Sequence, residues 1–128
     1  MDSNPVGWFE IYVADLPRAR KFYESVLGVK LESLPNPDKS NDNEMWSFPM
    51  KEGGRGAAGA LAKMKDGPAG GGTSTIVYFS CDDCAVEASR VAAAGGEVMK
   101  EKTAIGPYGY IALAVDTEKN IFGLHSLK

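Results

Sequence analysis

The sequence predicts an α+β fold in which two βαβββ modules follow one another along the chain. Two observations predict it. Segments 8–31 and 76–99 align without a gap at an offset of 68 residues, and each reads as a strand, a helix and a glycine stop. Three further strand-like runs, separated by turn residues, follow each segment. A chain of 128 residues has the length of one domain.

The opening strand of each module alternates between two sets of side chains, as a strand with one buried face does. We expect one set to lie under the helix of its module: Phe9, Ile11 and Val13, then Val77, Phe79 and Cys81. The other set faces the opposite side: Trp8, Glu10 and Tyr12, then Ile76, Tyr78 and Ser80. The same alternation in the last strand places Gly123 and His125 on one face.

Each helix is predicted by a capping aspartate, an apolar face and a glycine. Asp15 in the first copy, and Asp82 or Asp83 in the second, can accept hydrogen bonds from the free N–H groups of a helix start. Gly28 and the Gly95-Gly96 pair suit a left-handed helix end. The expected apolar faces are Ala19, Phe22, Tyr23, Val26 and Leu27 in the first helix, and Cys84, Ala88, Val91 and Ala92 in the second.

The remaining strands complete the two modules. We expect them at 29–34, 44–50 and 58–64, and again at 97–102, 110–115 and 121–127. We therefore predict a single domain, 1–128, with module one at about 6–65, a glycine-rich linker at about 66–73 and module two at about 74–128. Because each helix covers one sheet face, the opposite faces are free to enclose a shared cavity.

Charge and hydropathy exclude several classes of function. The formal net charge is −3 and the Lys and Arg residues are scattered, so we expect no nucleic-acid binding, which needs a basic face. No apolar run reaches the roughly 18 residues that a membrane helix requires, and the first residues do not resemble a signal peptide. We therefore expect a cytoplasmic protein that does not enter a membrane.

Two cysteines, Cys81 and Cys84, are three positions apart. This spacing can serve redox or metal chemistry, but a zinc site would need two more ligands and the chain has one histidine. We expect two small, buried side chains in a reducing compartment.

The segments 8–28 (WFEIYVADLPRARKFYESVLG) and 116–126 (DTEKNIFGLHS) resemble the opening and closing segments of the vicinal-oxygen-chelate superfamily. This superfamily includes glyoxalase I, bleomycin-resistance proteins and extradiol dioxygenases. The resemblance extends over essentially the whole chain and is strongest to small glyoxalase-like bacterial proteins, whose activity is not settled by their fold. It implies a mixed-sheet half-barrel around a small-molecule cavity, and commonly a homodimer.

The resemblance also indicates where metal-dependent relatives place their ligands. Those positions fall on Trp8, Ile76, Gly123 and the segment 59–62 of this chain. None of these side chains offers the imidazole nitrogen or carboxylate oxygen that such a metal needs. We therefore predict no metal and no cofactor.

Two polar residues stand one strand step from these positions: Glu10 beside Trp8, and His125 beside Gly123. We predict that they converge as a general base and a polar anchor. The alternatives are that Glu10 pairs with a nearby Arg or Lys, that His125 is a structural hydrogen-bonded residue, or that both bind a relocated metal. Aromatic side chains are the predicted ligand contacts, although some can instead fill the core: Trp8, Tyr12, Trp46, Phe48, Tyr78, Tyr110, and also Tyr108 in a predicted tight turn at 106–109.

The sequence favours a protein that binds a small aromatic or hydrophobic molecule in a metal-free cavity, as resistance proteins of this family do. A metal-independent lyase or isomerase with Glu10 as its base is the alternative. Two further alternatives are a metal-dependent glyoxalase or dioxygenase with an atypical site, and an interaction module without a small ligand.

Overall fold

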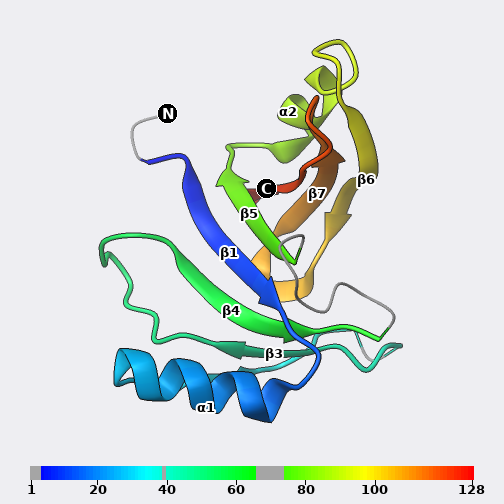
Figure 1. Cartoon of the computed structure of the whole chain (residues 1–128). Helices are drawn as coiled ribbons and strands as arrows, with labels where there is room; N and C mark the ends of the chain where they lie inside the picture. Colours follow the sequence, from blue (N-terminus) through cyan, green and yellow to red (C-terminus); the bar gives the residue numbers. More distant parts are fainter. Residues whose placement is uncertain (1–3, 39, 66–73) are drawn as a thin grey trace. The chain divides into compact units, whose positions relative to one another are not determined.

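The computed structural model describes residues 4–38, 40–65 and 74–128 (Figure 1). The strand and helix order is the βαβββ pattern twice, which confirms the predicted fold class. The predicted linker at 66–73 lies outside the described residues. The elements are β1 (Val6–Tyr12), α1 (Leu16–Leu27), β2 (Glu32–Leu34), β3 (Glu44–Ser47), β4 (Ala58–Lys63), β5 (Thr75–Ser80), α2 (Cys84–Arg90), β6 (Glu97–Ala104), the 3₁₀ turn η1 (Gly106–Tyr108), β7 (Tyr110–Val115) and β8 (Ile121–Ser126).

The chain divides into two compact units. Unit 1 consists of Met1–Trp8 and Ile76–Lys128, and unit 2 consists of Phe9–Thr75. The division falls inside β1, so the start of this strand belongs to unit 1 and its end belongs to unit 2. In unit 1, the Ser80 N–H donates to the Pro5 carbonyl at 2.9 Å.

Unit 2 contains a sheet in the order β2-β3-β4-β1, with α1 against one face (Figure 1). The β2-β3 and β3-β4 pairs are antiparallel, and Trp46 stands opposite Leu61. Its core forms around Leu16, Leu31 and Leu61, and these partly buried residues pack against them: Ile11, Val13, Ala19, Tyr23, Val29, Trp46 and Phe48.

The ends of α1 follow the predicted capping, but its apolar face is narrower than predicted. Asp15 accepts a hydrogen bond from the Arg18 N–H at 2.9 Å, and Gly28 adopts φ 66°, where a left-handed conformation favours glycine. Only Leu16, Ala19 and Tyr23 reach the core, since their spacing forms one stripe along the helix. The prediction was wrong for the apolar residues beside this stripe, which are exposed: Phe22, Val26 and Leu27.

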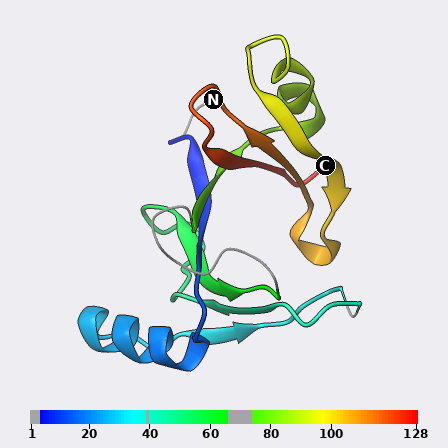
Figure 2. The same ribbon diagram turned by 45° about the vertical axis from the view of Figure 1, so that its right-hand side comes forward.

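Unit 1 contains a sheet in the order β5-β8-β7-β6, covered on one face by α2 (Figure 2). The β5-β8 pair is parallel, and the β8-β7 and β7-β6 pairs are antiparallel. Its core consists of Cys84, Ala88, Ala112 and Leu124, and these partly buried residues pack against it: Phe79, Cys81, Tyr110 and Phe122.

The second helix is shorter than its counterpart. Asp83 caps it by accepting a hydrogen bond from the Ala85 N–H at 3.0 Å, and α2 ends at Arg90. Two predictions were wrong here: Ala92, predicted on the apolar face, lies beyond the helix and is exposed, and Val77 of β5, predicted to lie under the helix, is exposed. A seven-residue helix is only about 10 Å long, so it covers less of its sheet than α1 does.

Candidate functional site

Each unit has one sheet face against its helix and one face opposite, which we call its helix-free face. In unit 2, Ile11 and Leu61 pack in the core beside α1. Strand alternation therefore places Glu10 and Tyr12 of β1, and Ala60 and Ala62 of β4, on the helix-free face. This is the face that the sequence predicts for Glu10 and Tyr12.

Glu10 and Tyr12 are joined by a hydrogen bond. The Tyr12 phenol donates to Glu10 Oε1 at 2.5 Å, and both side chains are only 5% exposed. Two backbone hydrogen bonds hold the end of β1. The Val13 N–H donates to the Ala62 carbonyl at 2.9 Å, and the Tyr12 N–H donates to the Ser74 carbonyl at 2.8 Å. Burial of a carboxylate is unfavourable unless hydrogen bonds compensate for the lost water, and the phenol supplies one.

The helix-free face of unit 1 carries a different set. Tyr78 stands opposite Gly123, and Ser80 stands opposite His125. A Cβ atom added at Gly123 would lie 2.1 Å from Cδ2 of the Tyr78 ring, so the ring lies directly on the glycine backbone. The position to which the resemblance assigns a metal-binding glutamate is therefore covered by an aromatic side chain.

His125 is held by the segment before β7. Its Nε2 lies 2.6 Å from the Tyr108 carbonyl oxygen. Because a carbonyl only accepts, Nε2 carries the proton, and Nδ1 is the nitrogen left for any other partner. Residues 106–108 form the 3₁₀ turn η1, in agreement with the predicted tight turn, and the Tyr108 side chain is exposed.

Three of the predicted ligand contacts lie on helix-covered faces instead. Trp46 and Phe48 pack in the core of unit 2, where the Arg20 guanidinium lies 3.5 Å from the centre of the Trp46 ring and the Phe48 ring meets Tyr23 edge-on. Tyr110 packs against the core of unit 1 on the side of α2. We therefore place these three aromatic residues in the core.

Trp8 and Tyr78 are the remaining aromatic predictions. Trp8 is half-buried in β1 and is the last residue of the first segment of unit 1. Tyr78 is buried in β5. Glu10 and His125 belong to different units, and their convergence stays a prediction.

The donor set does not fit the metal site of the metal-dependent relatives. Trp8, Ile76, Gly123 and the segment 59–62 supply no metal-binding side-chain atom. Within residues 4–38, 40–65 and 74–128, no group of three or more His, Cys, Asp or Glu side chains could hold a metal ion.

Both cysteines are free thiols that pack in unit 1. Cys84 is fully buried, and its backbone N–H donates to Ser126 Oγ at 3.0 Å. Burial, followed by the negative charge of Glu87, raises the pKa of the Cys81 thiol to about 11. Since the thiolate is the reactive form, a raised pKa keeps Cys81 mainly in the less reactive thiol form at neutral pH. Cys84 is buried as predicted, whereas Cys81 is only partly buried.

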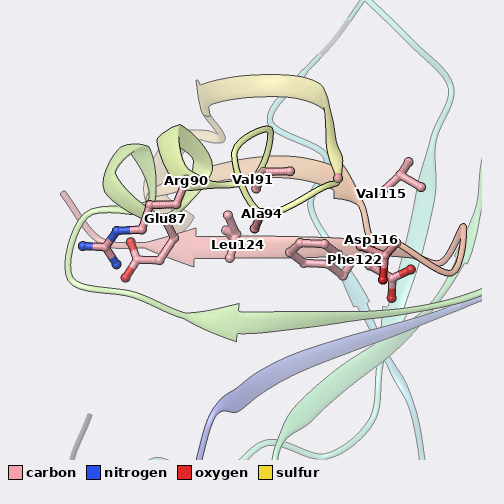
Figure 3. A pocket seen from close by; sticks show the side chains of 10 residues that line it. Glu87, Arg90, Val91, Ala94, Val115, Asp116, Phe122 and Leu124 are labelled. Carbon is pink, nitrogen blue, oxygen red and sulfur yellow. The ribbon is translucent and has the colours of Figure 1, made fainter.

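The structure adds two grooves that strand alternation does not predict. One, of about 520 Å³, lies in unit 2 at the end of β1 and is lined by Tyr12, Ser74 and residues of the first turns of α1. The other, of about 280 Å³, lies in unit 1 between α2 and β8 (Figure 3). Their residues come from helix sides and connecting turns, which periodicity assigns to no face in particular. Tyr12 is the predicted site residue that lines a groove.

Comparison with known families matches residues 6–122 to the Glyoxalase/Bleomycin resistance protein/Dioxygenase superfamily. The chain belongs to this superfamily. The match includes residues of both units, and it confirms the resemblance to this superfamily. No curated protein matches the chain.

Solved structures share the fold of this superfamily member at low identity. Methylmalonyl-CoA epimerase from Mycobacterium tuberculosis is 15% identical with a TM-score of 0.70, over 97% of this chain and 88% of that chain. The epimerase from Streptomyces coelicolor, in complex with 2-nitronate-propionyl-CoA, is 13% identical with a TM-score of 0.66, over 96% of both chains. A mutant 4-hydroxymandelate synthase from Streptomyces coelicolor is 17% identical with a TM-score of 0.67, over 99% of this chain and 39% of that chain.

Among the helices that the structure describes, none has the length and hydropathy needed to cross a membrane.

Proposed function

We propose that this superfamily member binds a small aromatic or hydrophobic molecule without a metal, and that the Glu10–Tyr12 pair is the polar anchor of the site. One observation carries the proposal. A buried carboxylate is hydrogen-bonded to a buried phenol, and the tyrosine that carries this phenol is one of the residues that line a groove of about 520 Å³. This volume falls within the range of about 300–1,000 Å³ that is typical of small-molecule sites.

The chemistry of the groove indicates what it would hold. Most of its wall is apolar or aromatic, including Ile11, Val13 and Phe22. An apolar residue at position 10 would bury at lower cost than a carboxylate, so stability alone does not explain Glu10. We expect a ligand with an apolar body and one hydrogen-bond donor, directed at the oxygen atoms of the pair.

The second candidate is a metal-independent lyase or isomerase in which Glu10 is the base. The same buried carboxylate supports it, because a base of this kind must be held rigidly within reach of the proton that it removes. Epimerases among the structural neighbours are consistent with an isomerase, although their identity to this chain shows the fold alone. His125, through Nδ1, is the proposed second polar group.

Elemental analysis followed by a ligand screen tests the proposal. Protein purified without added metal is expected to contain no stoichiometric Fe, Ni, Zn or Mn, and hits in a thermal-shift screen are expected to be apolar molecules with a donor group. Glu10→Gln is expected to weaken the best hit, whereas Glu101→Gln, which makes the same charge change at an exposed position, is not. A stoichiometric metal, or hits indifferent to Glu10→Gln and His125→Ala, would contradict the proposal.

Three further expectations concern the protein's surroundings. We propose a homodimer in the cytoplasm that has a small molecule, and no nucleic acid, as its partner. Light scattering coupled to size-exclusion chromatography tests whether the protein is a dimer. The chain mass of 13.7 kDa makes a monomer and a dimer easy to distinguish.

A further inference from the structure

Unit 1 holds a groove of about 280 Å³ that the proposed function does not use. It lies between β8 and the segment formed by α2 and the turn after it (Figure 3). Figure 3 shows Glu87 and Arg90 at one end and Asp116 at the other, with an apolar stretch between them. The apolar residues are Val91, Ala94, Phe122 and Leu124.

One oxygen at this groove stands out. Glu87 Oε1 is buried and has no hydrogen-bond partner among the residues that the structure describes, although the Glu87 carboxylate also interacts with the neighbouring Cys81 thiol. A buried acceptor without a partner is destabilising, and most such groups in folded proteins are matched by protein, water or ligand. Asp116, at the far end, is already engaged with its own turn, accepting from the N–H groups of Glu118 at 2.7 Å and Asn120 at 2.9 Å. The acceptor available to a ligand is therefore Glu87.

We propose that this groove binds a small organic cation, with its ammonium group on Glu87 Oε1 and its apolar body on Phe122 and Leu124. The sign of the charge follows from burial. Glu87 is partly buried with one oxygen enclosed, whereas Arg90 is exposed and its charge is solvated. The volume lies just below the usual range for drug-sized ligands, so a single-ring amine matches it.

This site is independent of the Glu10–Tyr12 site. Its lining residues all belong to unit 1, whereas those of the other groove all belong to unit 2. Either proposal can therefore fail without the other.

A titration of the ¹⁵N-labelled full chain with benzylammonium chloride, followed by NMR, tests the proposal. Saturable shifts are expected at the backbone amides of Val91, Gly96 and Phe122. Glu87→Gln is expected to weaken binding by about tenfold or more, the effect of losing a charge-assisted hydrogen bond. Glu101→Gln, at an exposed position on β6, is the charge-matched control and should leave the titration unchanged.

Two further experiments test the sign of the ligand charge and the position of the site. Phenylacetate, which is similar in shape but anionic, should bind the groove more weakly than benzylammonium. Ala94→Leu, which keeps Glu87 but adds bulk at the groove, should also weaken binding. The proposal is overturned if the groove amides do not shift, if phenylacetate binds there more tightly, or if Glu87→Gln has no effect while near-UV dichroism shows that the variant is folded. If the groove amides do not shift, water rather than an organic cation is the partner of Glu87 Oε1.

Discussion

The two units repeat one topology but differ on their helix-free faces. In unit 2, the face holds the hydrogen-bonded Glu10–Tyr12 pair next to two small residues of β4. In unit 1, the residue at the position equivalent to Glu10 is Tyr78, whose ring lies on the backbone of Gly123. A buried charge in one copy thus corresponds to an aromatic ring in the other.

The difference shows that equivalent positions of a duplicated scaffold can carry different side-chain chemistry. Tyr78 covers the backbone of Gly123, a closure that contributes to packing and leaves no room for a side chain there. Glu10 instead places a carboxylate at the equivalent position of unit 2, where Tyr12 donates a hydrogen bond to it.

The largest effect is expected for Gly123→Ala in unit 1. The new methyl group would meet the Tyr78 ring at 2.1 Å, so the ring must move, and we expect a loss of about 3 kcal/mol in the free energy of unfolding. Urea denaturation measures it. Combining the change with Tyr78→Ala should cost less than the sum of the two single changes, because the clash is then removed. Additive losses would contradict the close contact.

In unit 2, Tyr12→Phe should lower the free energy of unfolding by about 2 kcal/mol, since the buried Glu10 carboxylate loses a donor. Tyr108→Phe, at an exposed tyrosine, serves as the matched control and should be close to neutral. Equal effects of the two variants would show that the Tyr12 hydroxyl contributes no more than a surface hydroxyl does.

The aspartates that cap the two helices differ in how closely a positive charge approaches them. Asp15 caps α1 and lies 3.9 Å from the exposed Arg18, whereas Asp83 caps α2 and lies 2.9 Å from Lys102 Nζ. Asp83→Ala should therefore lower the melting temperature more than Asp15→Ala. The hydrogen bond from Lys102 lowers the pKa of Asp83 below 3.8, so its stabilisation is present above that pH and is lost as the pH falls further. A difference between the variants that persists at lower pH would contradict this pairing.

The smallest effect concerns Cys81. Because its pKa is about 11 in the folded chain and 9.0 otherwise, the unfolded chain loses this proton first, and stability should decline as the pH rises from about 9 to about 11. Cys81→Ser should remove that part of the decline. Glu87→Gln should lower the thiol pKa and speed alkylation of Cys81 by iodoacetamide. Alkylation that is fast at neutral pH in the unmodified chain would contradict the raised pKa.

The sequence predicted strand faces well wherever neighbouring residues alternate in polarity. Glu10 between Phe9 and Ile11, and Gly123 between Phe122 and Leu124, fell on the predicted sides because a strand period of two leaves no other choice. Trp46 and Phe48 could not be placed in this way, since both occupy the same face and the segment does not say which. The pairing of Trp46 with Leu61 decides it, and strand register depends on contacts distant in sequence.

The helices and grooves were predicted less well for a related reason. The apolar residues of α1 outnumber those that its sheet can cover, so Phe22 and Val26 are exposed although their spacing suits a core face. The groove of unit 1 depends on where α2 ends and on the turn that follows, and local sequence determines helix ends only loosely. Nothing in the sequence distinguishes Glu87 from other charged residues, because a charged side chain on a short helix is ordinarily exposed to solvent.

NMR mapping of the strongest hit from the thermal-shift screen can show whether the Glu10–Tyr12 pair anchors a small ligand, as we propose. We predict saturable shifts at the backbone amides of Tyr12, Ala62 and Ser74, and a Kd that rises about tenfold or more in Glu10→Gln but not in Glu101→Gln. A hit that binds the chain with unchanged affinity in Glu10→Gln, or that leaves these amides unmoved, would contradict the claim.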